Sequence, residues 1–343
     1  MNAENIVIAT AKERNLQIRY VRAPDGWVGP ENFELTHGDV PVPGDGEVLV
    51  RNHYLSLDPY QRRQMIPGVE YVRPLRLGAI MEGRTVGEVL QSQHRDFRTG
   101  DFVYGDFGWQ QFGVLRGEEI RKIDTTLAPP SAWLGVLGSP GITAWVGLLH
   151  VAKARAGETV IVSAAAGAVG SVVGQIARLS GCRVVGIAGG PQKCRLVVEE
   201  LGFHACVDYR VADFEAMLAQ ATPDGADVDF ENVGGTVFDT VLTRMNDFGR
   251  IALCGLVSQY NLREPQGLRN VATLLNRNLM LQGFRVGHYK EQREPALHQL
   301  ADWVRQGKLR FRETVAQGLE KAPQAFVDML AGHNVGKQVV KLV

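Results

Sequence analysis

Hydrophobic and polar residues follow one pattern in the first 130 residues and a different pattern in most of the rest. Between positions 6 and 130, short extended runs alternate with turn sequences such as Pro-Asp-Gly and Arg-Thr-Gly-Asp, and helical periodicity is scarce. The predicted strands cover residues 17–21, 33–36, 47–55, 85–90, 101–104 and 111–115. Many short strands with little helix predict a compact β barrel or sandwich.

After Pro129 and Pro130, apolar runs of strand length alternate with amphipathic helices. Residues 131–149 predict a broken helix pair that joins the two parts. The predicted strands then cover residues 160–162, 183–187, 205–207, 228–231, 250–254 and 280–284, and the predicted helices cover 169–179, 191–201, 213–220, 237–245 and 295–306. This alternation predicts a doubly wound parallel sheet with right-handed crossovers.

The end of the chain is expected to return to the β-rich part. A strand at 311–315, a helix at 321–330 and a strand at 338–342 follow the last crossover helix. Three sequence segments therefore make two domains: residues 1–131 with 309–343 form the β domain, and residues 132–308 form the α/β domain.

A turn rich in glycine and alanine follows the first strand of the α/β domain. A dinucleotide-binding turn needs three small residues, and Ala165, Gly167 and Gly170 stand at those places, with alanine for the first glycine of G-x-G-x-x-G. The following helix offers free N–H groups and a positive dipole end to phosphate. A second strand follows at the spacing of a βαβ unit of about thirty residues, which favours a nucleotide site over a turn that merely packs tightly.

The end of that second strand indicates which dinucleotide binds. An NAD site places an acidic residue about twenty positions past the glycines, whereas an NADP site carries positive charge there. No Asp or Glu lies between Gly170 and Lys193, and Arg195 follows. Lys193 and Arg195 could be solvated residues of a helix begun by Pro191, but a lysine at that helix end opposes the dipole. The sequence therefore favours NADPH over NADH.

Composition and charge exclude several classes of partner. Lysine plus arginine and aspartate plus glutamate each number 37, so the formal net charge is zero and nothing marks a surface for nucleic acid or an anionic membrane. Apolar stretches fall short of membrane-spanning length, and the first residues lack the pattern of a signal peptide. We expect a cytoplasmic protein that acts on a small molecule.

Cysteine usage bears on compartment and on metal binding. Cys182, Cys194, Cys206 and Cys254 lack C-x-x-C spacing and are expected to be buried free thiols in a reducing compartment. A zinc alcohol dehydrogenase of similar domain order needs thiolate ligands in its β domain, but no cysteine precedes Cys182. We therefore expect no metal and a hydride transfer that proceeds without one.

Without a metal to polarise a simple ketone, a conjugated carbonyl is the easier hydride acceptor. Hydride then adds to the β carbon, and negative charge develops on the carbonyl oxygen, which needs a hydrogen-bond donor. Tyr54 or Tyr260 is the candidate donor, with the cofactor ribose hydroxyl as a competitor and water as the proton source. Tyr209 and Asn232 follow other strands of the predicted sheet, where ligands of such sheets bind.

Several motifs together resemble one enzyme family. They lie at residues 54–62, 134–144, 164–171, 231–235, 254–261 and 334–337. They resemble the zinc-free medium-chain dehydrogenases/reductases, which include prostaglandin reductases, plant alkenal double-bond reductases and, with the strongest likeness, bacterial NADPH-dependent curcumin reductases. The resemblance implies an α/β fold class with a GroES-like β-barrel domain and a Rossmann domain. It also implies NADPH-dependent reduction of the C=C bond of α,β-unsaturated aldehydes or ketones, and a homodimer.

By matching position, the resemblance also implies site residues. Those expected to bind the cofactor are Thr143, Gly167, Ala168, Val169, Gly170, Lys193, Tyr209, Asn232, Cys254, Gly255, Leu256, Val257, Ser258, Tyr260, Phe284, Arg285, Val286 and Asn334. Tyr54 and Tyr260 are expected to border the substrate. The alternatives are an NADPH quinone reductase of the same superfamily, or a non-catalytic NADPH-binding sensor or crystallin-like protein. The physiological substrate, the proton donor and the dimer interface stay open.

Overall fold

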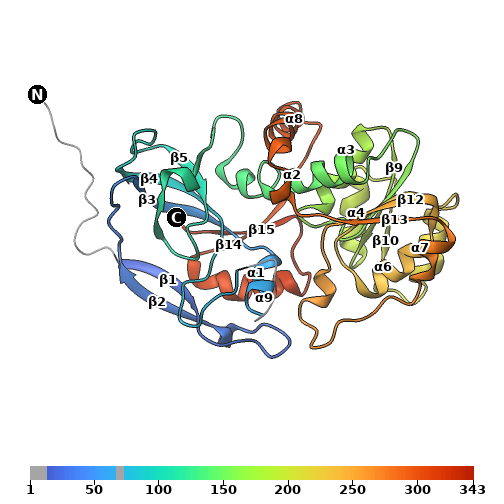
Figure 1. Ribbon diagram of the computed structural model, residues 1–343, viewed down its shortest axis with the longest axis horizontal. Coiled ribbons are helices and arrows are strands. Elements are labelled where there is room, and N and C mark those ends of the chain that lie inside the picture. The colour runs from blue at the N-terminus through green and yellow to red at the C-terminus, as the bar shows by residue number, and fades with distance from the viewer. Residues whose placement is uncertain (1–13, 67–72) are drawn as a thin grey trace, which may run out of the picture. The chain divides into compact units, whose positions relative to one another are not determined.

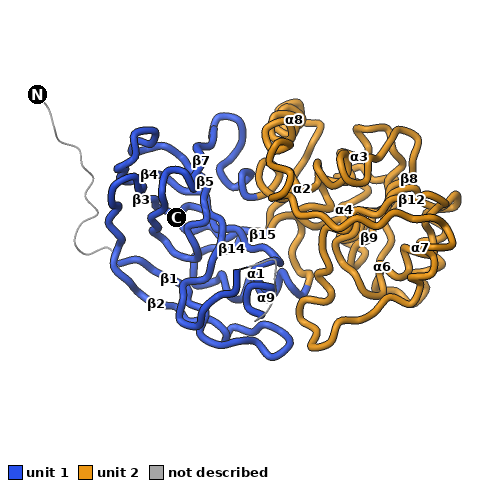
Figure 2. Tube along the Cα trace, in the orientation of Figure 1, with its two compact units in different colours: residues 1–134, 315–331, 338–343 blue, residues 135–314, 332–337 orange. Residues whose placement is uncertain are grey.

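The structure, a computed structural model, describes residues 14–66 and 73–343. Residues 1–13, where we expect no signal peptide, lie outside this range. The chain forms two compact units, coloured separately in Figure 2. Unit 1 comprises residues 1–134, 315–331 and 338–343, and unit 2 comprises residues 135–314 and 332–337. Relative to the expected domain bounds, unit 2 also takes in 309–314 and 332–337 from the tail.

Unit 1 is built mainly from short antiparallel strands, as the turn-rich pattern predicts. Its strands are β1 (Arg14–Tyr20), β2 (Phe33–Asp39), β3 (Glu47–Ser56), β4 (Thr85–Ser92), β5 (Phe102–Gly105), β6 (Phe112–Arg116) and β7 (Arg121–Lys122), joined by the tail strands β14 (Glu313–Gln317) and β15 (Lys337–Lys341). The helices are α1 (Tyr60–Gln64) and α9 (Ala322–Leu330). The strands form a two-stranded hairpin, β1–β2, and a sheet ordered β14-β15-β3-β4-β5-β7, with β6 paired to β3.

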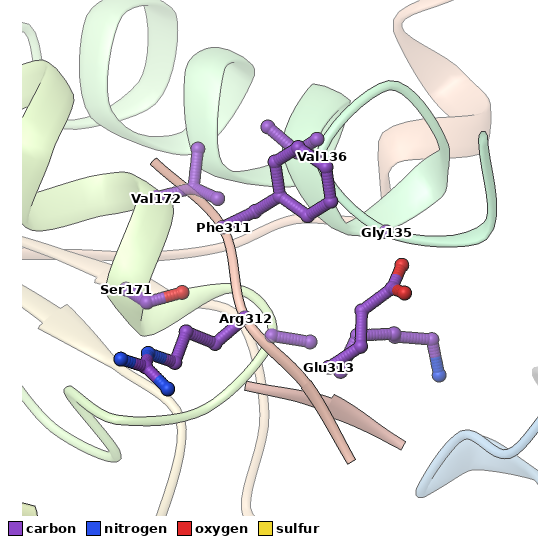
Figure 3. Close-up of a pocket in the computed structure, with 9 residues that line it drawn as sticks. Gly135, Val136, Ser171, Val172, Phe311, Arg312 and Glu313 are labelled. Atoms are coloured by element: carbon purple, nitrogen blue, oxygen red, sulfur yellow. The ribbon is translucent and has the colours of Figure 1, made fainter. Parts of the chain in front are cut away.

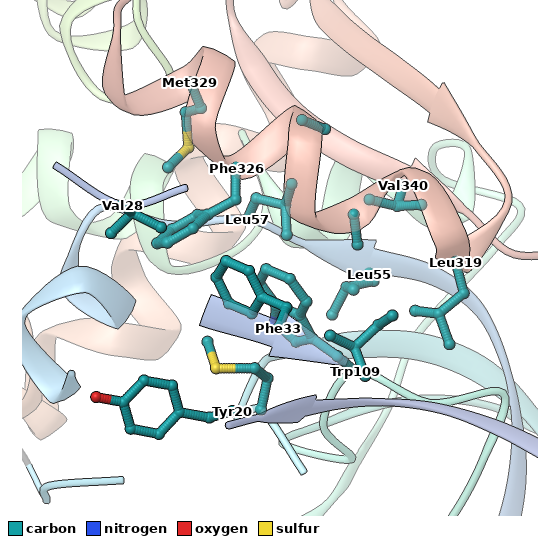
Figure 4. Close-up of a cluster of buried hydrophobic side chains, with 14 of the residues drawn as sticks. Tyr20, Val28, Phe33, Leu55, Leu57, Trp109, Leu319, Phe326, Met329 and Val340 are labelled. Atoms are coloured by element: carbon teal, nitrogen blue, oxygen red, sulfur yellow. The ribbon is translucent and has the colours of Figure 1, made fainter. Parts of the chain in front are cut away.

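The core of unit 1 joins its early strands to the tail helix α9. Phe33 of β2 stacks on Trp109 with ring centroids 5.6 Å apart, and Phe326 of α9 meets the Trp109 ring edge-on at 5.6 Å (Figure 4). Leu55 of β3 and Val340 of β15 are fully buried in the same cluster. Burial of these large side chains fixes the tail to the β-rich part of the chain.

Unit 2 alternates strands and helices along the chain (Figure 1). Its strands are β8 (Thr159–Val162), β9 (Arg183–Ala188), β10 (Ala205–Asp208), β11 (Ala226–Glu231), β12 (Met245–Leu253) and β13 (Met280–Gly283). Its helices are α2 (Ser139–Val146), α3 (Gly170–Leu179), α4 (Pro191–Glu199), α5 (Phe214–Ala221), α6 (Gly235–Leu242), α7 (Ala272–Asn276) and α8 (Arg293–Arg305), and a π-helical turn, Gly147–Val151, continues α2.

The six strands of unit 2 form a parallel sheet in the order β10-β9-β8-β11-β12-β13. Val185 and Ile187 of β9 and Val207 of β10 share one face and pack with α5 and α6. On the opposite face, Gly186 of β9 lies against Val197 of α4. Helices thus cover both faces, as the near-continuous apolar strands predict.

One predicted helix boundary is wrong. The helix expected over 237–245 is α6, which ends at Leu242, and Met245 instead begins β12. Met245 is fully buried and pairs with Ala226 of β11, and the Arg244 carbonyl accepts the Ala226 N–H. Pairing with the neighbouring strand satisfies backbone groups that a longer helix would leave without partners in the core.

Candidate functional site

The turn between β8 and α3 has the close packing that a phosphate-binding turn requires. A Cβ atom on Gly170 would lie 2.4 Å from the carbonyl oxygen of Ala164, so only glycine fits there. The Gly167 N–H donates to that same oxygen over 2.8 Å. Ala164 has a left-handed φ of 50°, which turns the chain sharply after the strand. The chain enters α3 directly from this turn, because the Ser171 N–H donates to the Gly167 carbonyl over 3.1 Å and the Val172 N–H donates to the Val169 carbonyl over 3.0 Å.

Two further glycines, which the sequence reasoning did not single out, let α3 and β9 pack closely. A Cβ atom on Gly174 of α3 would lie 1.8 Å from the ring of Phe203, and one on Gly186 of β9 would lie 2.8 Å from the Cβ of Ala165. Gly174 stands four residues after Gly170, on the same face of the helix. Helix and strand therefore approach more closely than larger residues at these positions would permit.

The segment that contains Asn334 lies beside the glycine-rich turn. The Gly336 N–H donates to the carbonyl of Ala166 over 2.7 Å, and Gly167 and Gly336 form a parallel bridge. The Asn334 side-chain amide donates to the Gly336 carbonyl over 2.8 Å. The structure thus brings together Gly167 and Asn334, two candidate residues 167 positions apart in the chain.

Lys193 and the residues after β10 gather near the start of α4. The Lys193 Nζ donates to the carbonyl of Gly332 over 2.6 Å. Burial lowers the pKa of Lys193, and the nearby Arg210 guanidinium lowers it further. The side chains of Tyr209 and Arg210 both lie next to Gly189, where a Cβ atom would be 3.0 Å and 2.9 Å from them. A second cation, Arg210, thus joins Lys193.

The structure also places a carboxylate there that the sequence reasoning did not weigh. Asp208 ends β10, and its Oδ1 accepts the N–H groups of Gly190 over 2.9 Å and of Arg210 over 3.0 Å. The Asp208 carboxylate thereby fixes the loops that carry Lys193 and Arg210. The sequence signal that could have located it is its position directly after the strand predicted over residues 205–207.

The loops after β11 and β12 are joined by backbone hydrogen bonds. The Val257 N–H donates to the Asn232 carbonyl over 3.1 Å, and the Ser258 N–H donates to the Val233 carbonyl over 2.9 Å. The Asn232 side chain donates to the Ser163 carbonyl over 2.8 Å. Asn232 and the expected residues Cys254, Gly255, Leu256, Val257 and Ser258 therefore form one connected surface beyond the carboxyl ends of the strands.

Two buried carboxyl groups lie beneath this loop. Glu231 is fully buried, and its Oε1 accepts the N–H groups of Val233 and Gly234, the latter over 2.6 Å. Burial raises the pKa of Glu231 to about 7, against these hydrogen bonds. Asp229 is buried without a hydrogen-bond partner for either oxygen, and burial raises its pKa well above the usual value. Glu231 anchors the loop, a role that sequence reasoning missed.

The remaining expected residues of unit 2 lie near α2 and after β13. The Phe284 ring meets Phe230 edge-on at 6.0 Å, and its tip lies 2.4 Å from where Gly147 would carry a Cβ atom. Arg285 precedes and Val286 begins a short 3-10 turn that contacts α2, the helix of Thr143. The structure therefore brings Thr143 and Phe284–Val286 to one region.

The two candidate tyrosines lie in different units. Tyr54 is a half-buried residue of β3, in register with Val86 of β4. The Tyr260 hydroxyl accepts the N–H of Leu256 over 3.4 Å, which holds the ring against the loop after β12. Near Tyr54 in sequence, Gln61 is fully buried, accepts the Asp58 N–H and donates to the Glu82 carbonyl.

A small pocket adjoins the first turn of α3 (Figure 3). It has room for about one water molecule and is lined by Gly135, Val136, Ala168, Ser171, Val172, Phe311, Arg312, Glu313 and Lys337. Its Arg312 guanidinium pairs with Glu200. Small-molecule sites usually enclose roughly 300–1,000 Å³. We therefore assign no ligand to this pocket.

The cysteines differ from expectation in their burial. All four are free thiols, but only Cys182 is buried, at 4% exposure, while Cys194, Cys206 and Cys254 are partly exposed. The expectation that all four are buried is therefore wrong for Cys194, Cys206 and Cys254. Among the described residues, no group of three or more His, Cys, Asp or Glu side chains is arranged to hold a metal ion.

Comparison with known proteins identifies the family. Residues 16–123 match a family model described as the N-terminal domain of oxidoreductase, and residues 168–303 match one described as zinc-binding dehydrogenase. The chain is 44% identical to the NADPH-dependent curcumin reductase of Escherichia coli over 96% of its length and 98% of that protein. It belongs to the medium-chain dehydrogenase/reductase family.

Other members of the medium-chain family agree with this assignment. The NADP⁺-dependent 2-alkenal reductase of Nicotiana tabacum is 42% identical over 87% of this chain and 88% of that protein. The crystal structure of CurA from Vibrio vulnificus in complex with NADPH has a TM-score of 0.91 and 43% identity, covering 96% of this chain and 99% of that chain. The expected family and the expected α/β fold class with a Rossmann-type sheet are confirmed.

Proposed function

We propose that this protein is an NADPH-dependent reductase of the C=C bond of α,β-unsaturated aldehydes and ketones. The observation that carries the proposal is the turn before α3, where only glycine fits at position 170, together with Lys193 and Arg210 near the ends of β9 and β10. The relatives named above carry NADPH dependence or an alkenal or curcumin substrate in their names. When bound, NADPH supplies the hydride.

The residues of unit 2 fit a dinucleotide with a 2′-phosphate. A Cβ atom on Gly170 would clash with the Ala164 carbonyl, so the third small residue of the turn allows α3 to pack closely on the strand, while Gly167, the second, stands where a pyrophosphate approaches the backbone in such turns. We propose that Gly167, Ala168, Val169 and Gly170 bind the pyrophosphate through the N-terminus of α3. Lys193 and Tyr209 bind the 2′-phosphate, and Arg210 adds positive charge.

We propose that the remaining candidates hold the rest of the cofactor. Asn232 and Asn334 present side-chain amides beside the sheet edge and the phosphate turn, which suits contacts to ribose and phosphate. The nicotinamide end is assigned to Thr143, Cys254, Gly255, Leu256, Val257, Ser258, Tyr260, Phe284, Arg285 and Val286. The connected loops after β11 and β12 support this assignment, since they form one surface.

We propose Tyr54 and Tyr260 as the tyrosines that border the substrate. As hydride adds to the β carbon, charge develops on the carbonyl oxygen, and a phenol hydroxyl can donate a hydrogen bond to it. The loss of one such donor lowers kcat by roughly 100- to 1,000-fold. Tyr54→Phe and Tyr260→Phe separate the two candidates. If neither variant lowers kcat, the donor is another group, such as a ribose hydroxyl or water.

The test of the function is turnover of a small enone panel with NADPH, followed by identification of the products. We expect saturated ketones or aldehydes, with curcumin-type dienones among the substrates. Hydroquinones formed from quinones, with enones untouched, would instead make the protein a quinone reductase. Tight NADPH binding with no acceptor reduced would make it a cofactor-binding protein without catalysis.

We also propose that the protein is a homodimer that pairs through the β13 edge of unit 2. Every residue of β13 is exposed, and Leu275 of α7 beside it is 81% exposed. Val271, Met280 and Leu281 add further exposed apolar surface. An open, apolar sheet edge is a site for pairing with another chain.

We also propose that the domain bounds lie at residues 132 and 309. A cytoplasmic location is a further proposal, which the four free thiols support.

The dimer is tested by the molar mass in solution. Leu275→Glu adds charge at the proposed interface, and Val42→Glu adds the same charge at an equally exposed site, 81%, in unit 1. We expect a dimer for the wild type and Val42→Glu and a monomer for Leu275→Glu. A wild-type monomer at micromolar concentration contradicts the proposal.

No helix in the described part of the chain has the length and hydrophobicity to cross a bilayer.

A further inference from the structure

Two thiols meet between α4 and β10. Cys194 lies in the first turns of α4, and Cys206 lies in the middle of β10. The two side chains face each other, and each shifts the pKa of the other. Both side chains are partly exposed and both are free thiols. The pair therefore lies side by side and within reach of small molecules in solution.

The packing of α4 on the sheet explains why the two cysteines meet. Val207 belongs to the core on the α5 and α6 side, so its neighbour Cys206 points to the opposite face, the side of α4. In the β9–β10 register Cys206 lies beside Gly186, which has no side chain to separate the helix from the sheet. A Cβ atom on Gly186 would lie 3.0 Å from Val197 of α4. Cys194 precedes Val197 by three residues and shares its helix face.

The two thiols differ in their chemistry. The neighbouring Cys206 thiol lowers the pKa of Cys194, against burial and the nearby Asp208 carboxylate, and the Ala188 N–H adds to this lowering. The neighbouring Cys194, together with burial, raises the pKa of Cys206. The thiolate is the reactive form of cysteine. Cys194 therefore has the character of an attacking thiol, and Cys206 that of a thiol that reacts second.

Cys182 provides an internal reference for this reactivity. It is buried, its thiol donates to the Arg155 carbonyl over 3.1 Å, and burial raises its pKa to about 11. A buried thiol with a raised pKa reacts slowly with oxidants. The contrast between Cys182 and Cys194 comes from their surroundings, since both are free cysteines of unit 2.

We propose that Cys194 and Cys206 are a redox-active pair that a hydroperoxide converts to a reversible intramolecular disulfide. The Cys194 thiolate attacks the peroxide oxygen, the O–O bond breaks, and the leaving alkoxide takes a proton to become the alcohol. The resulting Cys194 sulfenic acid is attacked by the Cys206 sulfur, which loses its proton as the S–S bond forms and water leaves. Two thiols and ROOH thus give a disulfide, ROH and water.

Disulfide formation is expected to change the cofactor site. To form the bond, the two sulfur atoms must approach to about 2.05 Å, which shifts the first turns of α4 toward β10. Lys193 is the residue before Cys194, and its Nζ is held on the Gly332 carbonyl. This consequence rests on the proposed function, because it assumes that Lys193 binds the 2′-phosphate. The disulfide itself does not.

The test begins with peptide mapping of the full-length protein after treatment with hydrogen peroxide and alkylation of the remaining thiols. We expect one cross-linked peptide pair, Cys194 with Cys206, with the loss of two hydrogens and full reversal by dithiothreitol. Cys182→Ser should behave as the wild type, and Cys194→Ser should form no link. In Cys206→Ser and Cys206→Ala, Cys194 should stop at a sulfenic acid that dimedone traps.

Two results overturn the pair. In the first, Cys194 of the wild type is alkylated equally fast before and after peroxide treatment. In the second, Cys182 is oxidised faster than Cys194.

A separate titration tests the link to the cofactor. NADPH should bind the disulfide form about tenfold more weakly than the reduced form, a change of about one charge-assisted contact. A disulfide with unchanged NADPH affinity refutes that link. Reduced protein that fails to bind NADPH refutes the proposed function and leaves the mapping result standing.

Discussion

The proposed 2′-phosphate site predicts that Lys193→Ala separates the two nicotinamide cofactors. The substitution removes a half-buried ammonium that the Gly332 carbonyl holds in place. NADH lacks the 2′-phosphate, so it loses no contact when Lys193 is removed. We expect weaker binding of NADPH and nearly unchanged binding of NADH.

The size of the effect follows from the surroundings of Lys193. One charge-assisted hydrogen bond contributes roughly 1.5–3 kcal/mol, which corresponds to a factor of about 10 to 150 in Kd. Arg210 lies near enough to lower the pKa of Lys193, so its charge also reaches the phosphate and offsets part of the loss. We therefore expect the low end, about a tenfold rise in the NADPH Kd, because Arg210 remains. The lost bond to Gly332 should also lower stability by roughly 1 kcal/mol.

The assay is a fluorescence titration of both cofactors against matched variants. Lys193→Arg keeps the charge and should bind NADPH within about threefold of the wild type, since a guanidinium also binds phosphate. Arg195→Ala removes a cation from the same turn of α4, but its side chain is exposed, and it should change either Kd by less than about twofold because solvent screens it. Equal losses for NADPH and NADH in Lys193→Ala, or equal effects of Lys193→Ala and Arg195→Ala, would refute the reasoning.

Three further predictions test the surrounding structure. Gly174→Ala places a Cβ atom 1.8 Å from the Phe203 ring and should lower the free energy of unfolding by about 2 kcal/mol in urea denaturation, whereas Gly267→Ala meets nothing within 4 Å and should not. Gly170→Ala should weaken NADPH and NADH alike in the titrations above, since it alters the turn under the shared pyrophosphate. Burial raises the pKa of Glu231 from 4.5 to about 7, so the folded state keeps the Glu231 proton up to a higher pH than the unfolded chain does. The contribution of protonated Glu231 to the free energy of unfolding is therefore lost as the pH rises through about 7. Glu231→Gln should lose about 3 kcal/mol of this pH dependence between pH 4.5 and 8, and parallel pH profiles for the two proteins would contradict it.

The parts of the fold that hydrophobic periodicity decides were predictable from the sequence. Strand β8, the turn and helix α3 follow from an apolar β-branched run, small residues and a helical stripe in that order. The requirement for glycine at position 170 follows from the same motif, and the structure gives its cause in the Ala164 carbonyl. Local sequence and local structure agree at the turn because its contacts, from Ala164 to Gly167 and Gly170, span only a few residues.

Contacts between distant segments could not be predicted from pattern alone. The Gly336 N–H reaches the turn at Ala166, and Glu231 holds the loop that carries Asn232. Neither contact leaves a periodic pattern in the sequence. The predicted end of α6 was wrong for the same reason, because the pairing of Met245 with Ala226 across the sheet sets the start of β12. Register between strands, rather than local propensity, sets these positions.

The first turn of α4 joins the two proposals through helix geometry. Successive residues of a helix point about 100° apart, so Lys193 can reach Gly332 while Cys194 reaches β10. Gly190, the residue before the helix, has a φ of 93° and no side chain with which to cap it. The Asp208 contact to Gly190, the Lys193 contact to Gly332 and the side of Cys194 that faces Cys206 all meet at this turn. A shift of this turn on oxidation of the proposed thiol pair is therefore expected to move the Lys193 charge that we propose selects the cofactor.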